Sequence, residues 1–163
     1  MMEQNVFRGM RRFKQQLTAE SCAEVLSTQP RGVLAVAGDG GYPYALPLDF
    51  YYDAQNGCLY FHCAKEGHKL DAIRRSDKVS FCVMDEGFRR EGEWALNIRS
   101  VIIFGRIRIV EDAGRREEIL RTLGLKYYPN PEDVEAELRR DGSRALCLEL
   151  VPDHISGKLV NES

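Results

Sequence analysis

Apolar residues alternate with polar ones in several runs of the chain, which is the spacing that β-strands produce. The longest run is 100–110, where isoleucines alternate with Arg106 and Arg108. Because alternate side chains of a strand point to opposite faces, this run predicts a strand with one buried and one wetter face. The same signal, or a short apolar run between turn residues, predicts further strands at 32–37, 44–52, 58–63, 78–84 and 145–151.

Helices are predicted where apolar residues recur every three or four positions. Thr18 is suited to cap a helix that ends near Gln29, before Pro30. Asn56-Gly57 is a hairpin signal, and the polar segment 85–97 is expected to form a mobile loop. Further helices are expected at about 67–75, 113–127 and 131–140, the last with a proline near its start.

Six strands with helices around them predict an α+β protein. Closing the strands into a barrel removes exposed strand edges, which otherwise pair with other chains. The chain has 163 residues, a length that favours one domain. Hydrophobic residues make up 44% of it and charged residues 29%, which fits a folded globular protein and argues against disorder.

Charge and cysteine content narrow the expected surroundings and partners. The formal net charge of −2 gives no attraction to nucleic acid or to an anionic membrane. No apolar run approaches the roughly 20 residues of a membrane-spanning helix, and residues 1–9 lack the apolar core of a secretory signal. The five cysteines are odd in number and widely spaced, which argues against a disulfide framework. We therefore expect a cytoplasmic protein in which Cys82 and Cys147 are small core residues.

The segment 60–69 carries the most informative chemistry. A strand ends there, a short loop contains Gly67, and a helix begins with His68 and Lys69. Free N–H groups and the positive dipole end favour an anion at a helix start, and glycine lets the backbone approach it closely. The segment is a candidate phosphate cradle, to which Arg74 and Arg75 can add charge. A solvated helix start without any ligand explains the same residues and remains the alternative.

Other combinations of reactive residues are less consistent with known chemistry. The spacing of His62, Cys63 and His68 does not match a closed zinc site, so no metal is expected. Adjacent strand residues point to opposite faces, so His62 and Cys63 are not expected to form a nucleophile–base pair. Pro47 lies within a predicted strand and removes a backbone donor. It indicates either a protected edge strand or a surface on which a flat ring lies against the main chain.

Five segments occur in a specific order and spacing, at 10–12, 40–47, 61–69, 100–106 and 154–158. Together they resemble the nitroimidazole-resistance (Nim) branch of the pyridoxamine-phosphate-oxidase-like flavoproteins. The resemblance covers nearly the whole chain from Met10 and leaves residues 1–9 as an N-terminal extension. It implies a six-stranded antiparallel split β-barrel of Greek-key type over 10–163, with peripheral helices. It further implies a homodimer that binds one FMN per subunit at the shared interface.

The resemblance also implies a role for individual residues. The helix start at Gly67 and His68 with Lys69 corresponds to the phosphate site, and Ser100 to a polar flavin contact that often faces the partner subunit. His68 matches the histidine associated with activity in Nim-type proteins and is therefore the candidate catalytic residue. The positions expected beside the isoalloxazine ring and the ribityl chain are Ala45, Leu46, Pro47, Leu48, His62, Cys63 and Ala64.

The function that the resemblance implies is an FMN-dependent oxidoreductase of nitroreductase type. Reduced flavin would pass electrons to a nitro group or another small acceptor, in a pocket walled by Tyr44 and Trp94. Vitamin oxidation is not expected, because the pattern that holds a pyridoxal substrate is not evident. One alternative is a flavin-binding protein without turnover. Another is a haem-binding protein in which His62, His68 or His154 ligates iron.

Overall fold

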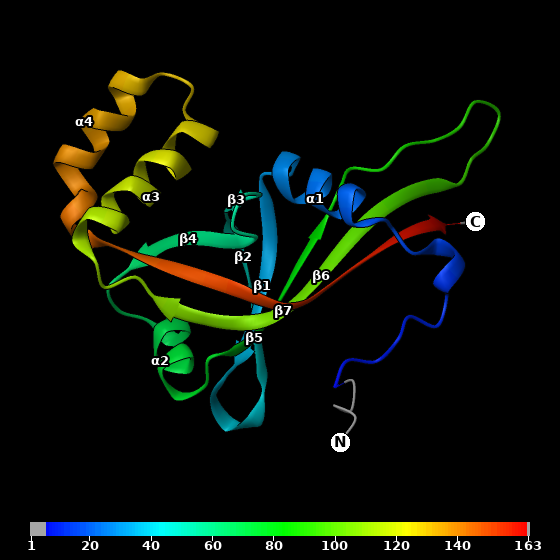
Figure 1. Cartoon of the computed structure of the whole chain (residues 1–163), viewed down its shortest axis with the longest axis horizontal. Coiled ribbons are helices and arrows are strands. Elements are labelled where there is room, and N and C mark those ends of the chain that lie inside the picture. Colours follow the sequence, from blue (N-terminus) through cyan, green and yellow to red (C-terminus); the bar gives the residue numbers. More distant parts are fainter. Residues whose placement is uncertain (1–5, 163) are drawn as a thin grey trace.

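The computed structural model describes residues 6–162, so only residues 6–9 of the expected N-terminal extension can be compared with it. Within that range one curled antiparallel sheet carries four α-helices around it (Figure 1). The strands are β1 (Arg31–Ala37), β2 (Pro43–Asp49), β3 (Tyr51–Asp53), β4 (Cys58–Ala64), β5 (Lys78–Met84), β6 (Leu96–Ile109) and β7 (Ala145–Glu162). The helices are α1 (Ala19–Thr28), α2 (His68–Arg75), α3 (Ala113–Tyr127) and α4 (Pro131–Asp141), with short 3-10 turns η1 (Phe13–Gln15), η2 (Asp39–Gly41) and η3 (Gly142–Arg144).

The sheet has the strand order β2-β1-β5-β6-β7-β4-β3, and all of its described pairs are antiparallel. The α+β class and the antiparallel strands are therefore confirmed. The sheet has seven strands rather than six, because the strand predicted at 44–52 is broken at Phe50. Its first part, β2, pairs with β1 at one edge, and its second part, β3, pairs with β4 at the other. The two edge strands are thus consecutive in the chain.

Two strands are longer than the sequence predicts. β6 begins at Leu96 rather than Ser100, and β7 continues to Glu162 rather than ending at Val151. β6 pairs with β7 along the whole length of β6, with a register shift between Phe104 and Gly105, next to Pro152. Proline after a strand is a stop signal in a sequence, but a bulge tolerates it.

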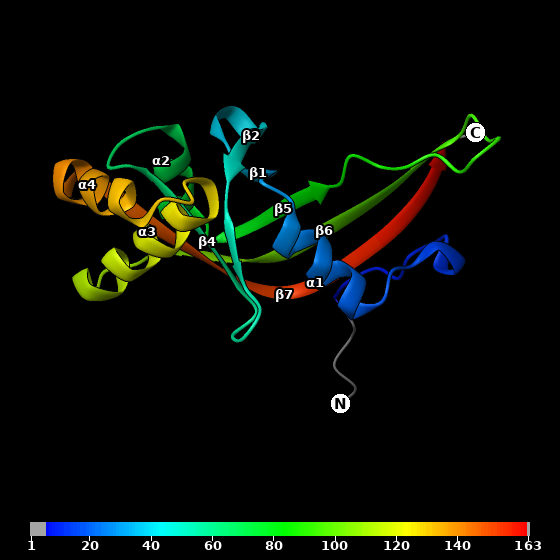
Figure 2. The same ribbon diagram turned by 90° about the horizontal axis from the view of Figure 1, so that it is seen from above.

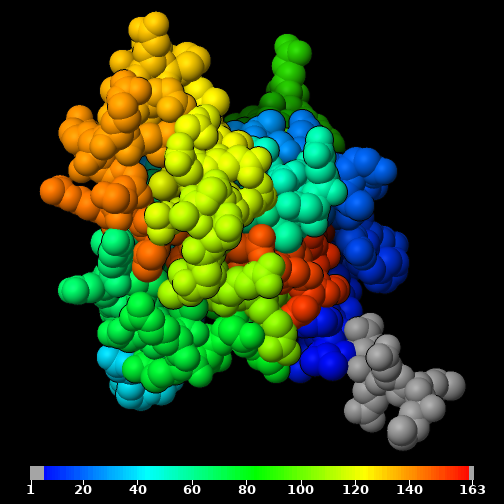
Figure 3. Space-filling model, turned by 60° about the vertical axis from the view of Figure 1, so that its left-hand side comes forward, coloured from blue at the N-terminus to red at the C-terminus, as the bar shows by residue number. Residues whose placement is uncertain are grey.

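The helices lie where their periodicity and capping residues predict them. Thr18 Oγ1 accepts a hydrogen bond from the Ser21 N–H at 3.1 Å and begins α1. Asn130 caps α4 in the same way, with Pro131 in its first turn. α1 crosses the sheet near β6 and β7, whereas α3 and α4 lie together at the other end of the molecule (Figures 1 and 2). In Figure 3 α3 runs down the face of the molecule that this view shows.

Two clusters of buried side chains hold the fold together. The larger one joins α1, through Val25 and Leu26, to the concave side of the sheet. The smaller one lies under α3 and includes Tyr60 and Cys147. Cys147 is buried as predicted, but Cys82 is exposed, which corrects its assignment to the core. Successive side chains of β5 point to opposite faces of the sheet. The residues before and after Cys82 point into the core, so Cys82 points outward.

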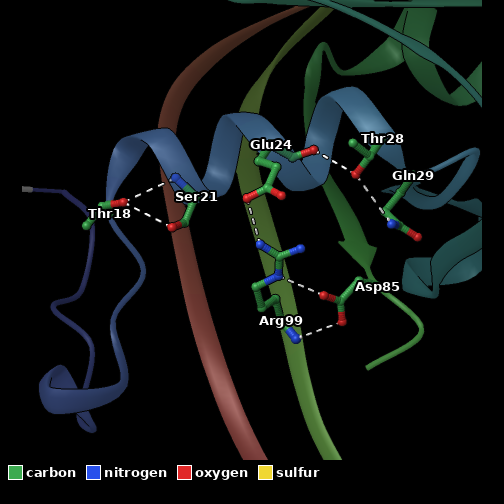
Figure 4. Close-up of polar contacts among 7 residues, drawn as sticks. All are labelled: Thr18, Ser21, Glu24, Thr28, Gln29, Asp85 and Arg99. Atoms are coloured by element: carbon green, nitrogen blue, oxygen red, sulfur yellow. Dashed lines mark hydrogen bonds and ion pairs between the residues drawn. The ribbon is translucent and has the colours of Figure 1, made fainter. Parts of the chain in front are cut away.

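The segment between β5 and β6 is anchored at both ends rather than free along 85–97. Asp85 accepts hydrogen bonds from the Arg99 N–H at 2.9 Å and from Arg99 Nε at 2.8 Å. Arg99 also reaches Glu24 of α1 at 2.9 Å, which ties the loop to the helix (Figure 4). Burial raises the pKa of the Asp85 carboxyl, but these hydrogen bonds outweigh burial and the pKa is lowered overall. None of the helices described in residues 6–162 is long and apolar enough to cross a membrane.

Candidate functional site

The start of α2 is open to an incoming group. Gly67 is its N-cap residue, with φ 136° and ψ 165°, and no side chain of the described residues caps the helix. A Cβ atom placed on Gly67 would meet nothing within 4 Å, so the space in front of the first turn is open. Uncapped N–H groups and the helix dipole favour an anion at this point. This geometry fits the phosphate cradle expected from the sequence.

The basic side chains of α2 differ in their partners. Arg75 forms an ion pair with Asp39 of η2 at 2.7 Å, and Arg74 lies 3.8 Å from Asp71. Lys69 is partly buried and takes part in no ion pair among residues 6–162. Unlike Arg74 and Arg75, Lys69 therefore has no carboxylate partner among the described residues.

His68 contacts an aromatic ring and lies near a carboxylate. The ring of Tyr44 lies 4.2 Å from the imidazole, centroid to centroid, with 18° between the planes. His68 Nε2 lies 3.6 Å from Asp39 Oδ2, which is too long for a hydrogen bond. The imidazole is therefore fixed in orientation, which both a phosphate contact and a proton-transfer role require. Asp39 was not identified from the sequence, since aspartate between glycines is typical of a turn.

β2 presents two different faces, as the strand period requires. Leu46 and Leu48 pack against the core, whereas Ala45 and Pro47 are exposed. β2 is an edge strand, so the missing N–H of Pro47 breaks no ladder hydrogen bond on the open side. The edge-strand interpretation of Pro47 is confirmed.

The end of β4 places its residues as the alternation predicts. His62 and Ala64 are exposed, and Cys63 packs against the core. Burial raises the pKa of the Cys63 thiol, and the charges of Lys69 and Arg74 only partly offset this. Cys63 is therefore a neutral packing residue rather than a thiolate nucleophile.

The outer face of the sheet is unusually apolar and uncovered. One row of neighbouring positions crosses five strands as Pro47, Val33, Cys82, Ile102 and Ser156, and the next row contains Phe104 and His154. Ile102 is 40% exposed and Phe104 is 42% exposed. The ring of Phe7 packs here, 4.7 Å from the His154 ring and nearly parallel to it. We call this face, from β2 across to β7, the outer sheet face.

Two predicted site residues lie apart from α2. Ser100 belongs to the outer sheet face, paired in register with Met84 and Lys158, and β1 and β5 separate its strand from β2. Trp94 is 76% exposed in the β5–β6 loop. Figures 1 and 2 show this loop at the opposite end of the molecule from α2. Within one chain, therefore, Trp94 and Tyr44 do not form a common pocket.

Two hollows of the surface lie away from these residues. One of about 390 Å³ is lined by Tyr51, Tyr60 and Arg115, between β3 and α3. Another of about 420 Å³ lies between α3 and α4. Neither contains a residue that the sequence assigned to the site.

Among the described residues no group of three histidine, cysteine, aspartate or glutamate side chains is close enough to hold a metal ion. The assembled site is thus an open surface formed by α2, β2 and the end of β4.

Comparison with known proteins identifies the family. Residues 18–159 match the sequence profile of pyridoxamine 5'-phosphate oxidase. The chain belongs to the pyridoxamine 5'-phosphate oxidase family. A search of curated proteins found no match.

Solved structures of similar fold agree with that family. One is a candidate 5-nitroimidazole antibiotic resistance protein from Bacteroides thetaiotaomicron, with TM-score 0.74, 16% identity, and coverage of 90% of this chain and 87% of that one. Another is an FAD- and haem-binding protein from Mycobacterium smegmatis, with TM-score 0.71, 24% identity, and coverage of 89% and 73%. A third is a flavocytochrome from Azotobacter vinelandii, with TM-score 0.71, 17% identity, and coverage of 93% and 72%. The sequence match confirms the expected family, and these structures share its fold.

Proposed function

We propose that this protein binds FMN and acts as an oxidoreductase on nitro compounds or similar small acceptors. The observation that carries the proposal is the uncapped start of α2 beside Lys69, in a chain of this family. A phosphate monoester needs backbone N–H donors, a close backbone approach and a cation, and this helix start offers all three.

The residues present fit the remainder of the cofactor. A flat ring would lie along β2 beside Ala45 and Pro47, whose side chains are small or rigid and exposed. His62 and Ala64 would flank the ring and the ribityl chain from the end of β4, with Cys63 supporting them from the core side. When bound, FMN supplies the hydride or electron transfer itself, and the protein supplies position and field.

FMN rather than FAD is the cofactor that we propose. The solved relatives include proteins whose descriptions say that they bind FAD, so the choice must be tested directly. A single uncapped helix start with Lys69 suits one terminal phosphate. Extraction of the bound cofactor, followed by mass measurement, separates FMN from FAD and from a deazaflavin.

A homodimer with flavin at the shared interface is part of the same proposal. A second copy of the chain is the natural cover for the outer sheet face, because a self-complementary apolar patch is buried twice in a symmetric dimer. Such a dimer would also bring Ser100 and Trp94 of a second copy within reach of a flavin on β2, which one chain does not. The cytoplasm is the compartment that we propose, since all five cysteines are free thiols.

His68 is the residue of this chain that we propose to act on protons. Conversion of a nitro group to a nitroso group and water consumes two electrons and two protons, so a nearby proton donor is needed. Tyr44 stacks on the imidazole, and Asp39 Oδ2 lies 3.6 Å from its Nε2. Tyr44, together with Trp94 of a second copy, would form walls for the acceptor.

The test combines an absorption spectrum with anaerobic turnover. Purified protein loaded with FMN should show the two flavin bands, and after chemical reduction under anaerobic conditions metronidazole should reoxidise it. Protein that binds no flavin contradicts the proposal. Bound flavin that no nitroaromatic or quinone reoxidises would support the alternative of a flavin-binding protein without turnover. A Soret band in place of the flavin bands would support haem.

A further inference from the structure

A partly buried lysine at the end of α3 reaches the break between β2 and β3. Lys126 Nζ donates hydrogen bonds to the carbonyl oxygens of Phe50 at 2.7 Å and Gln29 at 2.8 Å. The same ammonium lies 4.0 Å from the centroid of the Phe50 ring. One side chain therefore contacts both the α1–β1 junction and the break between β2 and β3.

The next residue, Tyr127, binds the same place. Its hydroxyl accepts a hydrogen bond from the Phe50 N–H at 2.9 Å. The hydroxyl oxygen also lies within hydrogen-bond range of the carbonyl oxygens of Phe50 and Pro30, one of which receives its proton. Both polar groups of the Phe50 backbone are thus bound by consecutive side chains of α3.

Phe50 needs these partners because the strand ladder does not supply them. β2 pairs with β1 up to Asp49, and β3 begins to pair with β4 at Tyr51, so Phe50 falls between the two ladders. Its side chain is fully buried against Phe81 in the core. A buried backbone group without a hydrogen-bond partner is strongly unfavourable. Lys126 and Tyr127 therefore determine how β2 ends.

Packing alone does not account for a lysine at this position. Burial lowers the pKa of Lys126 to about 8, which records the cost of removing the ammonium from water, although Asp49 opposes the shift. An apolar side chain would fill the same space without that cost. The lysine is instead matched to the two carbonyl oxygens and the ring face that it contacts.

We propose that Lys126 and Tyr127 are positioning residues for the flavin site, acting through Phe50 on the path of β2. This inference rests on the proposed function, because it takes Ala45–Leu48 to line the flavin ring. Phe50 follows Leu48 by two residues, so a change in how β2 ends alters where those residues lie. Lys126 and Tyr127 themselves need not touch the cofactor.

The experiment compares Lys126→Met and Tyr127→Phe with the unaltered protein and with Lys14→Met. Lys14 is exposed in η1, so its replacement makes the same charge change away from the site. FMN affinity is measured by quenching of flavin fluorescence, and the visible circular dichroism is recorded with FMN at saturation. We expect both α3 variants to bind FMN about tenfold more weakly and to give altered flavin dichroism. Lys14→Met should match the unaltered protein in both.

A second readout does not involve flavin. Hydrogen exchange of the Phe50 amide should be faster in Tyr127→Phe, because the hydroxyl that accepts its hydrogen bond is gone. This variant removes one oxygen and keeps the ring, so it remains informative if Lys126→Met fails to fold.

The outcomes separate the two proposals. Unaltered FMN affinity and dichroism in Tyr127→Phe, with faster exchange at Phe50, would overturn the positioning role and leave FMN binding intact. Failure of the unaltered protein to bind FMN would overturn the proposed function and this inference with it.

Discussion

The aromatic ring of Tyr44 and the imidazole of His68 lie parallel, with centroids 4.2 Å apart, although 23 intervening residues separate them in the sequence. The contact joins β2, where the ring of a flavin is expected, to the start of α2, where its phosphate is expected. The contact therefore links the two parts of the proposed site directly.

Gly67→Ala should destabilise the protein through the backbone. The φ of 136° is rarely adopted by residues with a Cβ, although no neighbouring atom obstructs one. We expect the free energy of unfolding in urea to fall by about 1–2 kcal/mol. The matched control is Gly9→Ala, which also meets no neighbouring atom but lacks a positive φ. Equal stability of the two variants would contradict the strained geometry at the helix start.

Asp39→Asn should tighten FMN binding. Asp39 places a negative charge beside the proposed phosphate site and neutralises Arg75. Removal of that charge should improve FMN affinity about threefold. A change of this size corresponds to the free energy that a single exposed ion pair contributes. Glu118→Gln removes a similarly exposed carboxylate, which pairs with Arg115 on α3, and serves as the control. Weaker binding in Asp39→Asn would indicate that Asp39 holds His68 in place rather than competing with phosphate.

Ile102→Glu should prevent dimer formation. Ile102 lies in the middle of the outer sheet face, and a buried carboxylate without a partner is costly. Sedimentation velocity should show a dimer for the unaltered protein and a monomer for the variant. Leu125→Glu is the control, because Leu125 is 42% exposed on α3, away from that face. A monomer for the unaltered protein, or a dimer for Ile102→Glu, contradicts the proposed interface.

Lys126 should leave a signature in the dependence of stability on pH. Its pKa is about 8 in the folded protein, against an ordinary value of 10.5. Between these values the unfolded chain binds more protons than the folded one, so this residue makes the free energy of unfolding rise with pH. The difference in stability between the unaltered protein and Lys126→Met should therefore shift by about 1–3 kcal/mol in favour of the unaltered protein from pH 7 to pH 10. Urea unfolding at four pH values measures it, and a constant difference contradicts the burial of the ammonium.

The sequence predicted the elements whose signals are local. Capping by Thr18 and the position of Pro131 gave the helices nearly to the residue, since the cap geometry depends on neighbours in the chain. The helix start at Gly67 was predicted for the same reason. The helix start that we propose to bind the phosphate could therefore be predicted from the sequence.

The remaining differences depend on contacts between distant residues. The break at Phe50 has no glycine or proline to mark it, and its partners come from α3. β7 passes Pro152 because the partner strand β6 shifts register there. The prediction that Cys82 lies in the core was wrong because β5 carries apolar residues on both faces. Alternation along a strand does not show which of two apolar faces is buried. The outer sheet face could have been predicted from the sequence, because β1, β5 and β6 carry apolar residues on both of their faces.

The most direct test of the central claim compares FMN with riboflavin, which lacks the phosphate. Both ligands are titrated into the unaltered protein and into Lys69→Glu, with Lys14→Glu as the control. If the phosphate binds at the start of α2, the unaltered protein prefers FMN to riboflavin by about tenfold or more, and Lys69→Glu loses that preference while its riboflavin affinity is unchanged. An undiminished preference for FMN in Lys69→Glu would contradict the account.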